Sequence, residues 1–319
     1  MDKTAVQCNR DVIGRRSLSL TQEKQKETVN DADLAKGNLL KIASLSKLQR
    51  ISVLDSVKKS YDMMNRRRAV LYNSGSPGSN LKATLKHKEL DNFAEAIFSL
   101  HQVEPELCLL FINENSYLAS LPKTERRKIF GHFASHLQGI EGPYMSWAYG
   151  TDNGDRVWVM PNKIYLNLKH MEHYFDSNIE IVQALNLDKT TALRIHEVTF
   201  INAMDMIDTY ITRVAPTEDE VIFLLGLIIY DPGMKNVNHE TKNILQKTRN
   251  LLIKEFLTVH RNDSIDPVIR LDEILWIFSG VKEYTSQLRR DMLMFRFFDI
   301  LPPNEYFDEI WSVDMCDIC

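Results

Sequence analysis

Near the end of the chain stands the segment Tyr306-Phe-Asp-Glu-Ile-Trp311. Written as an α-helix, it places Phe307, Ile310 and Trp311 on one apolar stripe by three- and four-residue spacing, with its two acidic side chains at the rim. Isolated helices shorter than about 12 residues are marginal in water, so this helix must gain its order from a surface on which the stripe docks. The sequence therefore predicts a short terminal helix whose docking is conditional, which is the property of a switch.

The composition is that of an ordinary globular protein. Of its 319 residues, 44% are hydrophobic and 26% are charged, which is enough for a sizeable core. The densest apolar run, Val221–Tyr230, is half as long as the roughly 20 residues needed to span a bilayer, and the N-terminus lacks the apolar core of a secretory signal. Four scattered cysteines fit a reducing compartment better than a disulfide framework. We therefore expect no membrane partner.

The formal net charge of −4 conceals an asymmetry between the two ends of the chain. Arg10, Arg15 and Arg16 make the first residues basic, whereas the segment from Phe297 onward carries six Asp or Glu residues and no Lys or Arg. A basic segment attracts phosphate and an acidic one repels it. The basic beginning of the chain is therefore suited to contact with phosphate, and the acidic end is not.

Helical periodicity dominates the sequence from Leu45 onward. Apolar residues recur three or four positions apart within each segment, and prolines or turn-forming residues separate the segments. The predicted helices lie at approximately 45–68, 93–100, 107–111, 123–140, 198–214, 217–230, 244–259 and 271–295. With the terminal helix and shorter pieces, the pattern predicts about ten helices in one compact domain.

Local signals sharpen this outline. Pro105 separates two predicted helices, because proline usually ends a helix. Thr217 and Glu220 stand in capping-box register before an apolar run that we expect to be buried on most faces. Asn153-Gly154 precedes the β-favouring residues Val157–Met160, which predicts a two-residue hairpin turn leading into a strand.

Several segments resemble the ligand-binding domain of nuclear hormone receptors, in particular of the branch expanded in nematodes. Thr124–Phe133 and Gly139–Tyr144 resemble the family's fourth and fifth helices, and Arg156–Asn162 resembles the hairpin that follows them. Thr217–Leu225 resembles the eighth helix. Tyr306–Trp311 fits the activation-helix pattern of two apolar residues, any residue, Glu and two apolar residues. The resemblance implies an all-α layered helical sandwich of about ten to twelve helices with one small β-hairpin.

The resemblance also implies a domain organisation. Residues 1–16 resemble the segment that closes the family's zinc-finger DNA-binding module, residues 17–40 are polar enough for a hinge, and residues 41–319 form the ligand-binding domain. The module itself needs eight thiolates at tight spacings, which this sequence lacks. We therefore expect DNA binding only through a zinc-finger module absent from this chain, whether the chain is an isolated fragment, an isoform or a truncated gene prediction.

The family's mechanism implies roles for particular side chains. The docked terminal helix completes a groove for an amphipathic coregulator helix, and Glu309 caps the N-terminal backbone N–H groups of that helix. The family's usual lysine for the opposite end is missing, because residues 104–122 contain no Lys or Arg. Lys123, Arg126 and Arg127 are the candidates to replace it; with equal weight, they form a solvated helix face.

A ligand pocket in the family's position implicates side chains near Leu109, Ile112, Phe133, Met145 and Met292. Apolar stripes of this kind are core residues in most proteins, so a filled pocket is as consistent with the sequence as a liganded one. We expect no cofactor, and any ligand should be a lipophilic small molecule.

No catalytic motif emerges from the sequence. His132 and His136 share a helix face, but Phe133 stands where a zinc protease has its Glu, and Cys316-x-x-Cys319 is a lone pair near the end of the chain. The leading hypothesis is thus a non-enzymatic nuclear transcription factor domain that switches coregulator binding and is able to form receptor homo- or heterodimers.

Two rival hypotheses remain open. The first is a ligand-independent dimerisation or repression scaffold that uses Leu271–Phe295 as its partner surface. The second is a helical hydrolase, which requires a cleft of carboxylates or histidines with perturbed pKa near His132 and His136.

Overall fold

The computed structural model describes residues 51–73, 86–91, 93–153, 156–170, 174, 189–262, 265–297 and 304–311. The chain divides after Arg50 into two units. All described residues belong to the second unit, Ile51–Cys319. The interpretation of residues 1–16 and 17–40 as the end of a DNA-binding module and a hinge falls outside the described residues.

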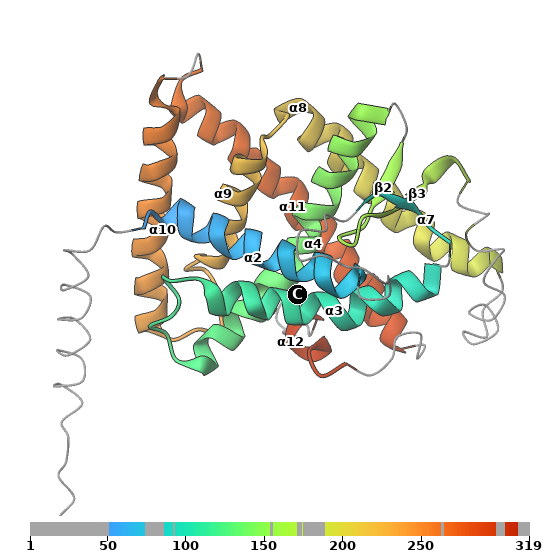
Figure 1. The fold of residues 1–319 in the computed structure, drawn as a ribbon, viewed down its shortest axis with the longest axis horizontal. Coiled ribbons are helices and arrows are strands. Elements are labelled where there is room, and N and C mark those ends of the chain that lie inside the picture. The colour runs from blue at the N-terminus through green and yellow to red at the C-terminus, as the bar shows by residue number, and fades with distance from the viewer. Residues whose placement is uncertain are drawn as a thin grey trace, which may run out of the picture. The chain divides into compact units, whose positions relative to one another are not determined.

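The predicted mostly helical fold with a small sheet is confirmed (Figure 1). The helices are α2 (Val53–Asn73), α3 (Phe93–Glu114), α4 (Lys123–Asn153), α7 (Lys189–Met206), α8 (Thr212–Val214), α9 (Glu218–Ile229), α10 (His239–Val259), α11 (Pro267–Phe297) and α12 (Phe307–Trp311). Short turns of helix are η1 (Leu168–His170), the π-helical η2 (Ile207–Ile211) and η3 (His260–Asn262). None of the described helices has the length and continuous apolar character needed to cross a bilayer.

Helices α4 and α9 form the middle of the helical body (Figure 1). They pack against each other; α3 covers α4 and α2 covers α9 on one side, while α11 packs against α4 from the other side. Helix α9 is buried along almost its whole length, as its apolar sequence predicts. The predicted capping box is also confirmed: the Thr217 side chain accepts from the Glu220 N–H, and the Glu220 carboxylate accepts from the Thr217 N–H at 2.7 Å.

A small sheet lies at the edge of the helical body, with strands β1 (Lys88–Glu89), β2 (Val157–Val159) and β3 (Ile164–Asn167) in the order β1-β3-β2. Strands β2 and β3 are antiparallel, which confirms a hairpin, whereas β1 adds a parallel strand that the sequence did not predict.

The hairpin turn is not where the sequence placed it. Asn153 is the last residue of α4, and the strands are joined instead at Met160–Lys163, where the Lys163 N–H donates to the Met160 carbonyl at 2.8 Å and Lys163 has a φ of 64°. The prediction at Asn153-Gly154 was wrong because asparagine near a helix end signals a helix terminus as readily as a hairpin turn.

Two helical predictions also need correction. Pro105 does not separate two helices but lies inside the continuous helix α3. In α7, Val198 and Ile201 were assigned to the buried stripe, yet they are 49% and 53% exposed, while Phe200 and Ala203 are buried. The buried face then continues through the π-helical turn η2, whose extra residue per turn shifts the phase of the stripe.

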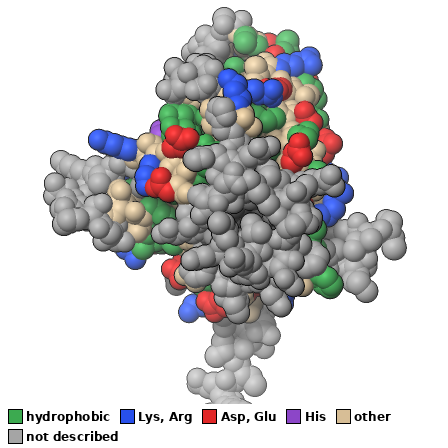
Figure 2. Space-filling view, turned by 90° about the vertical axis from the view of Figure 1, so that its right-hand side faces the viewer, with side chains coloured by type: hydrophobic (Ala, Val, Ile, Leu, Met, Phe, Trp, Pro, Cys, Tyr) green, Lys and Arg blue, Asp and Glu red, His purple; other side chains and the backbone are tan. Residues whose placement is uncertain are grey.

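On the face shown in Figure 2, acidic and basic side chains of the described residues are interspersed with apolar ones. This distribution gives no large field of one sign on the visible described surface.

Candidate functional site

Helix α12 docks on the helical body through the stripe that the sequence predicted. Its three apolar side chains are buried, with Phe307 6%, Ile310 7% and Trp311 2% exposed, and the helix packs against α4 and α11. Asp308 and Glu309 remain exposed. The stripe therefore faces the body of the protein, and the acidic side chains are what α12 presents to solvent.

Asn304 fixes the point at which the chain enters α12. Its side-chain amide donates to the His101 carbonyl of α3 at 2.6 Å, and its Oδ1 accepts from the Tyr306 N–H at 2.8 Å. The His101 carbonyl can accept this bond because the residue four positions later in the helix is Pro105, which has no N–H to donate. The proline inside α3 thus creates an acceptor that anchors α12.

Gly131 allows α12 to approach α4 closely. A Cβ atom built at Gly131 would lie 2.2 Å from the Glu309 carbonyl oxygen, which is a severe backbone clash. A residue with a side chain at this position therefore requires α12 to move. No local pattern signals this role, because the glycine lies in the middle of an otherwise regular helix.

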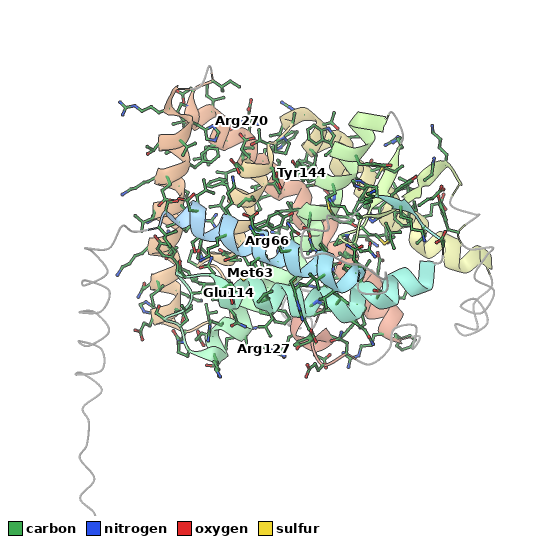
Figure 3. All side chains as sticks on the ribbon, in the orientation of Figure 1. Met63, Arg66, Glu114, Arg127, Tyr144 and Arg270 are labelled. Atoms are coloured by element: carbon green, nitrogen blue, oxygen red, sulfur yellow. The ribbon has the colours of Figure 1, made fainter. Side chains whose placement is uncertain are left out.

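Ion pairs at the rim of α12 add to the apolar contacts. The Arg127 guanidinium, which lies beside α12 (Figure 3), binds the Glu309 carboxylate through two nitrogens, with an Nη2 to Oε1 distance of 2.7 Å. The hydrogen bond to Glu309 raises the pKa of Arg127. Arg127 also lies 4.7 Å from the centroid of the Tyr306 ring, and Arg296 pairs with Asp308. Each pair is partly exposed, so each contributes modestly.

Of the three cations proposed to replace the missing lysine, only Arg127 contacts Glu309. Lys123 is exposed at the first residue of α4. Arg126 is half-buried, and within the described residues its Nε has no hydrogen-bond partner.

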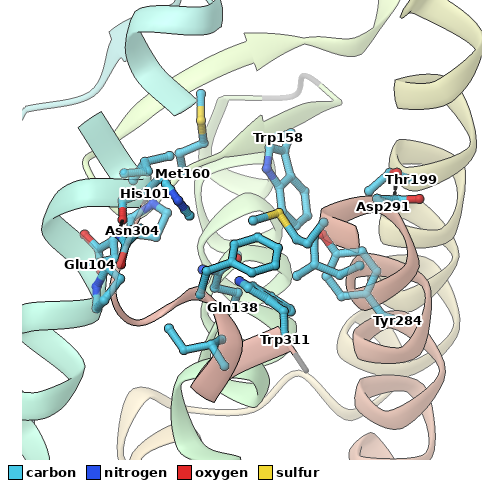
Figure 4. Close-up of a pocket in the computed structure, with 18 of the residues that line it drawn as sticks. His101, Glu104, Gln138, Trp158, Met160, Thr199, Tyr284, Asp291, Asn304 and Trp311 are labelled. Atoms are coloured by element: carbon cyan, nitrogen blue, oxygen red, sulfur yellow. Dashed lines mark hydrogen bonds between the residues drawn. The ribbon is translucent and has the colours of Figure 1, made fainter. Parts of the chain in front are cut away.

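A cavity of about 150 Å³ lies behind α12 (Figure 4). Its walls come from α3, α4, the hairpin, α7, α11 and α12, and they are mostly apolar or aromatic: Leu100, His101, Glu104, Pro105, Gln138, Gly142, Trp158, Met160, Pro161, Leu166, Thr199, Phe200, Tyr284, Leu288, Asp291, Met292, Asn304, Phe307, Ile310 and Trp311. A cavity of this volume accommodates a molecule the size of benzene.

The sequence located this cavity only in part. Met292 lines it, as predicted, but Leu109, Ile112, Phe133 and Met145 do not. Ile112 and Phe133 are buried in the main core, Leu109 packs against that core, and Met145 packs with β2. Their stripes were correctly interpreted as buried, but the periodicity of a helix does not say which of its buried faces meets a void.

A buried charge cluster links the first three described helices. Arg68 of α2, 2% exposed, binds Glu104 of α3 at 2.7 Å and Glu141 of α4 at 2.8 Å, and the Tyr61 hydroxyl donates to Glu141 at 2.8 Å. The sequence predicted only that the first helix ends near Arg68, and it did not predict this cluster. A signal was present, because Arg68 follows Tyr61 and Met64 at the three- and four-residue spacing of the buried stripe.

The histidine pair lies apart from the cavity. Burial lowers the pKa of His132 to about 3 and also lowers the pKa of His136. His132 Nε2 is 3.6 Å from an Asp231 carboxylate oxygen, and neither histidine lines the cavity. Among the described residues, no group of three His, Cys, Asp or Glu side chains is placed to hold a metal ion.

No family model matches the sequence. Two nuclear receptors of Caenorhabditis elegans are similar to it. The chain is 21% identical to the High zinc activated nuclear receptor protein over 83% of its own length and 65% of that protein, so it spans about two thirds of that relative. It is also 21% identical to nuclear hormone receptor family member nhr-53, over 96% of its length and 74% of that protein. The chain is therefore nuclear receptor-like over most of its length.

Proposed function

We propose that this chain is the ligand-binding and transactivation domain of a nuclear hormone receptor, acting on transcription in the nucleus without catalysing a reaction. The observation that carries the proposal is the double position of α12. Phe307, Ile310 and Trp311 line the cavity, while Asp308 and Glu309 face solvent. One short helix thus senses an occupant on one side and offers charge to a partner on the other.

The cavity couples to α12 through shared contacts. A helix of five residues has little stability of its own, so its docking equilibrium depends on what its apolar side chains touch. A lipophilic ligand in the cavity adds contacts to Trp311 and Phe307 only while the helix is docked. Such a ligand therefore shifts the population toward the docked state by its differential affinity for the two states.

The coregulator enters this proposal through Glu309. The Glu309 carboxylate is the acceptor for the N-terminal N–H groups of an amphipathic coregulator helix, but Arg127 already occupies it. A partner helix of two turns is about 11 Å long, so two side chains in direct contact cannot hold its opposite ends. In this proposal Arg127 occupies the Glu309 carboxylate until a coregulator helix binds. Lys123 and Arg126 are the candidates to contact the C-terminal end of that helix.

The comparisons support this proposal at the level of a receptor and leave its ligand to be proposed. One relative is named for activation by high zinc. Because the walls of the cavity are mostly apolar or aromatic, we propose a lipophilic organic ligand for this chain. DNA binding by the full-length protein is proposed to reside in a zinc-finger module outside this chain.

A titration with a fluorescent coactivator-derived helical peptide tests the function. We expect Glu309→Ala to weaken peptide binding about tenfold or more, because a hydrogen bond to a charged group is lost. Asp308→Ala is the matched control, since Asp308 is the neighbouring exposed acid and pairs with Arg296 instead. Equal affinities for the wild type and Glu309→Ala would contradict the switch.

The alternative function, a ligand-independent dimerisation or repression scaffold, has one supporting observation. Val259, Val268 and Ile269, at the end of α10 and the start of α11, are 63%, 64% and 57% exposed. Such side chains suit a protein interface. The proposed Leu271–Phe295 surface is less suitable, because Leu271, Leu275, Phe278 and Leu288 pack against the core. Indifference of the peptide titration to Glu309→Ala, together with a dimer in solution, would favour this scaffold.

A further inference from the structure

A buried carboxylate lines the cavity behind α12. Asp291 of α11 is 3% exposed, and its oxygens accept from the Thr199 hydroxyl of α7 and from the Gln287 side-chain amide at 2.9 Å. Burial raises the pKa of Asp291. Within the described residues no Lys or Arg forms an ion pair with it, and both Asp291 and Thr199 line the cavity (Figure 4).

The other buried charges do not offset this carboxylate. Glu104 lines the opposite side of the cavity (Figure 4) and shares the single guanidinium of Arg68 with Glu141. Of these three buried carboxylates, Asp291 and Glu104 line the cavity, and Arg68 is the one buried guanidinium among the described residues. The remaining buried carboxylates have cations of their own, since Glu125 pairs with Lys128 and Glu220 pairs with Arg270.

The carboxylate also has capacity to spare. An ionised carboxylate accepts about four hydrogen bonds, and the protein supplies two here. Burying a charge without a counter-ion is costly, so a cation that enters the cavity and pairs with Asp291 binds favourably. Trp158, Tyr284 and Trp311 add aromatic walls to the same space, and aromatic faces attract ammonium groups.

We propose that the cavity binds a small monoamine: an apolar body of about one aromatic ring that carries one protonated amine, whose N–H groups donate to the Asp291 carboxylate. This inference rests on the proposed function only in taking the cavity as the ligand site. It narrows the lipophilic ligand predicted from the sequence to an amphipathic cation. The volume of about 150 Å³ excludes larger bodies such as a steroid, unless the walls move.

The competing explanation is structural. The Thr199–Asp291 hydrogen bond joins α7 to α11, and a buried acid can serve as a helix-to-helix tie without any ligand. The two explanations differ in what they predict for ligands. A tie affects stability alone, whereas a recognition site discriminates between an amine and its neutral isosteres.

The test is calorimetric titration of the purified chain at pH 7 with phenethylamine, 2-phenylethanol and ethylbenzene, which share one ring and differ in the donor. A change in tryptophan fluorescence supports binding at this location, because two of the four tryptophans, Trp158 and Trp311, line the cavity. We expect phenethylamine to bind about 10- to 100-fold more tightly than ethylbenzene, with 2-phenylethanol between them. Absence of phenethylamine binding, or equal affinity for all three probes, overturns the proposal.

Variants separate recognition from structure. Asp291→Asn keeps the shape and removes the charge, and it should abolish the preference for the amine; a preference that persists in the folded variant overturns the proposal. Asp205→Asn, an exposed carboxylate on α7, is the matched control. If Asp291→Asn does not fold, Thr199→Val is compared with the wild type instead. This variant removes a hydrogen-bond donor that competes with the amine for Asp291, so it should still prefer the amine. Loss of the amine preference in Thr199→Val would count against the proposal.

Peptide binding measured in the same samples keeps this inference distinct from the proposed function. An amine preference without any peptide binding contradicts the coregulator switch and leaves the cavity assignment intact. Peptide binding that depends on Glu309, without an amine preference, contradicts only the ligand class.

Discussion

Helices α9 and α12 both rest on α4, but they are held in opposite ways. Helix α9 is buried from Glu220 to Ile229, carries its own capping box and is joined to α11 by an ion pair between the buried Glu220 and the half-buried Arg270. Helix α12 has five residues, three of them buried, and its ion pairs are partly exposed. We therefore expect α9 to leave its place only if the protein unfolds, whereas the switch proposed for α12 requires this helix to detach while the rest stays folded.

The N-terminal half of α4 connects the two. Gly131 meets the backbone of α12, and the next residue, His132, lies near Asp231 just after α9. Substitutions in neighbouring residues of one helix should therefore have different consequences: loss of global stability on the α9 side, and loss of switching on the α12 side.

The largest effect is expected in α9. Leu224 is fully buried, and Leu224→Ala should lower the free energy of unfolding by about 2–5 kcal/mol, because it removes apolar contacts and leaves a cavity. Urea denaturation followed by circular dichroism measures the change. Leu251→Ala on α10, where the side chain is 43% exposed, is the control and should cost less than about 1 kcal/mol. Similar losses for both variants would show that α9 is not a rigid centre.

The second effect is a pH dependence set by His132. Burial lowers its pKa to about 3 from an ordinary value near 6.5, with further lowering by His136 and Arg289. Between pH 6.5 and pH 3 the unfolded chain therefore binds a proton at His132 that the folded protein does not bind. The free energy of unfolding is thus unaffected by this group above pH 6.5, and it decreases as the pH falls from 6.5 toward 3. Each pKa unit corresponds to about 1.4 kcal/mol of free energy of unfolding. Because the His132 side chain is 27% exposed and water screens its charge, we expect a total loss of only about 2 kcal/mol, less than the full pKa shift implies.

Thermal or urea unfolding between pH 7 and 4 measures this dependence. His132→Gln should flatten the profile, since glutamine does not titrate. A profile of unchanged slope in that variant would assign the pH dependence to other groups, of which His136 is the nearest candidate.

What the sequence could predict divides along the same line. Helix α9 and its capping box follow from apolar periodicity and from the Thr217–Glu220 spacing, both of which are local, and so does the stripe of α12. The features that place α12 are contacts between residues far apart in the chain: Gly131 with Glu309, and Asn304 with the His101 carbonyl, to which Pro105 has no N–H to donate. No local pattern encodes them, so the sequence predicted that the helix docks but not where or how.

The third prediction tests the close contact at Gly131. Gly131→Ala should displace α12, because its Cβ would lie 2.2 Å from the Glu309 carbonyl oxygen. We expect faster amide hydrogen exchange in α12 and at least about tenfold weaker binding of the coactivator-derived peptide. Global stability should hold or rise, since alanine favours the α4 helix by about 1 kcal/mol over glycine. Unchanged exchange in α12 would mean that the backbones of α4 and α12 move apart at this position without loosening α12, which would contradict the prediction.

The smallest effect concerns the ion pair between Arg127 and Glu309. Its side chains are 37% and 35% exposed, so a double-mutant cycle with Arg127→Ala and Glu309→Ala should give a coupling of only about 0.2–1 kcal/mol for the docking of α12. Arg127→Ala should weaken the docking of α12 slightly but strengthen peptide binding. If Arg127 occupies the Glu309 carboxylate in the free protein, its removal makes the carboxylate available to the peptide, and the affinity for the peptide should rise a few-fold. Weaker peptide binding in Arg127→Ala would instead make the arginine part of the coregulator surface, with α12 depending on it for docking.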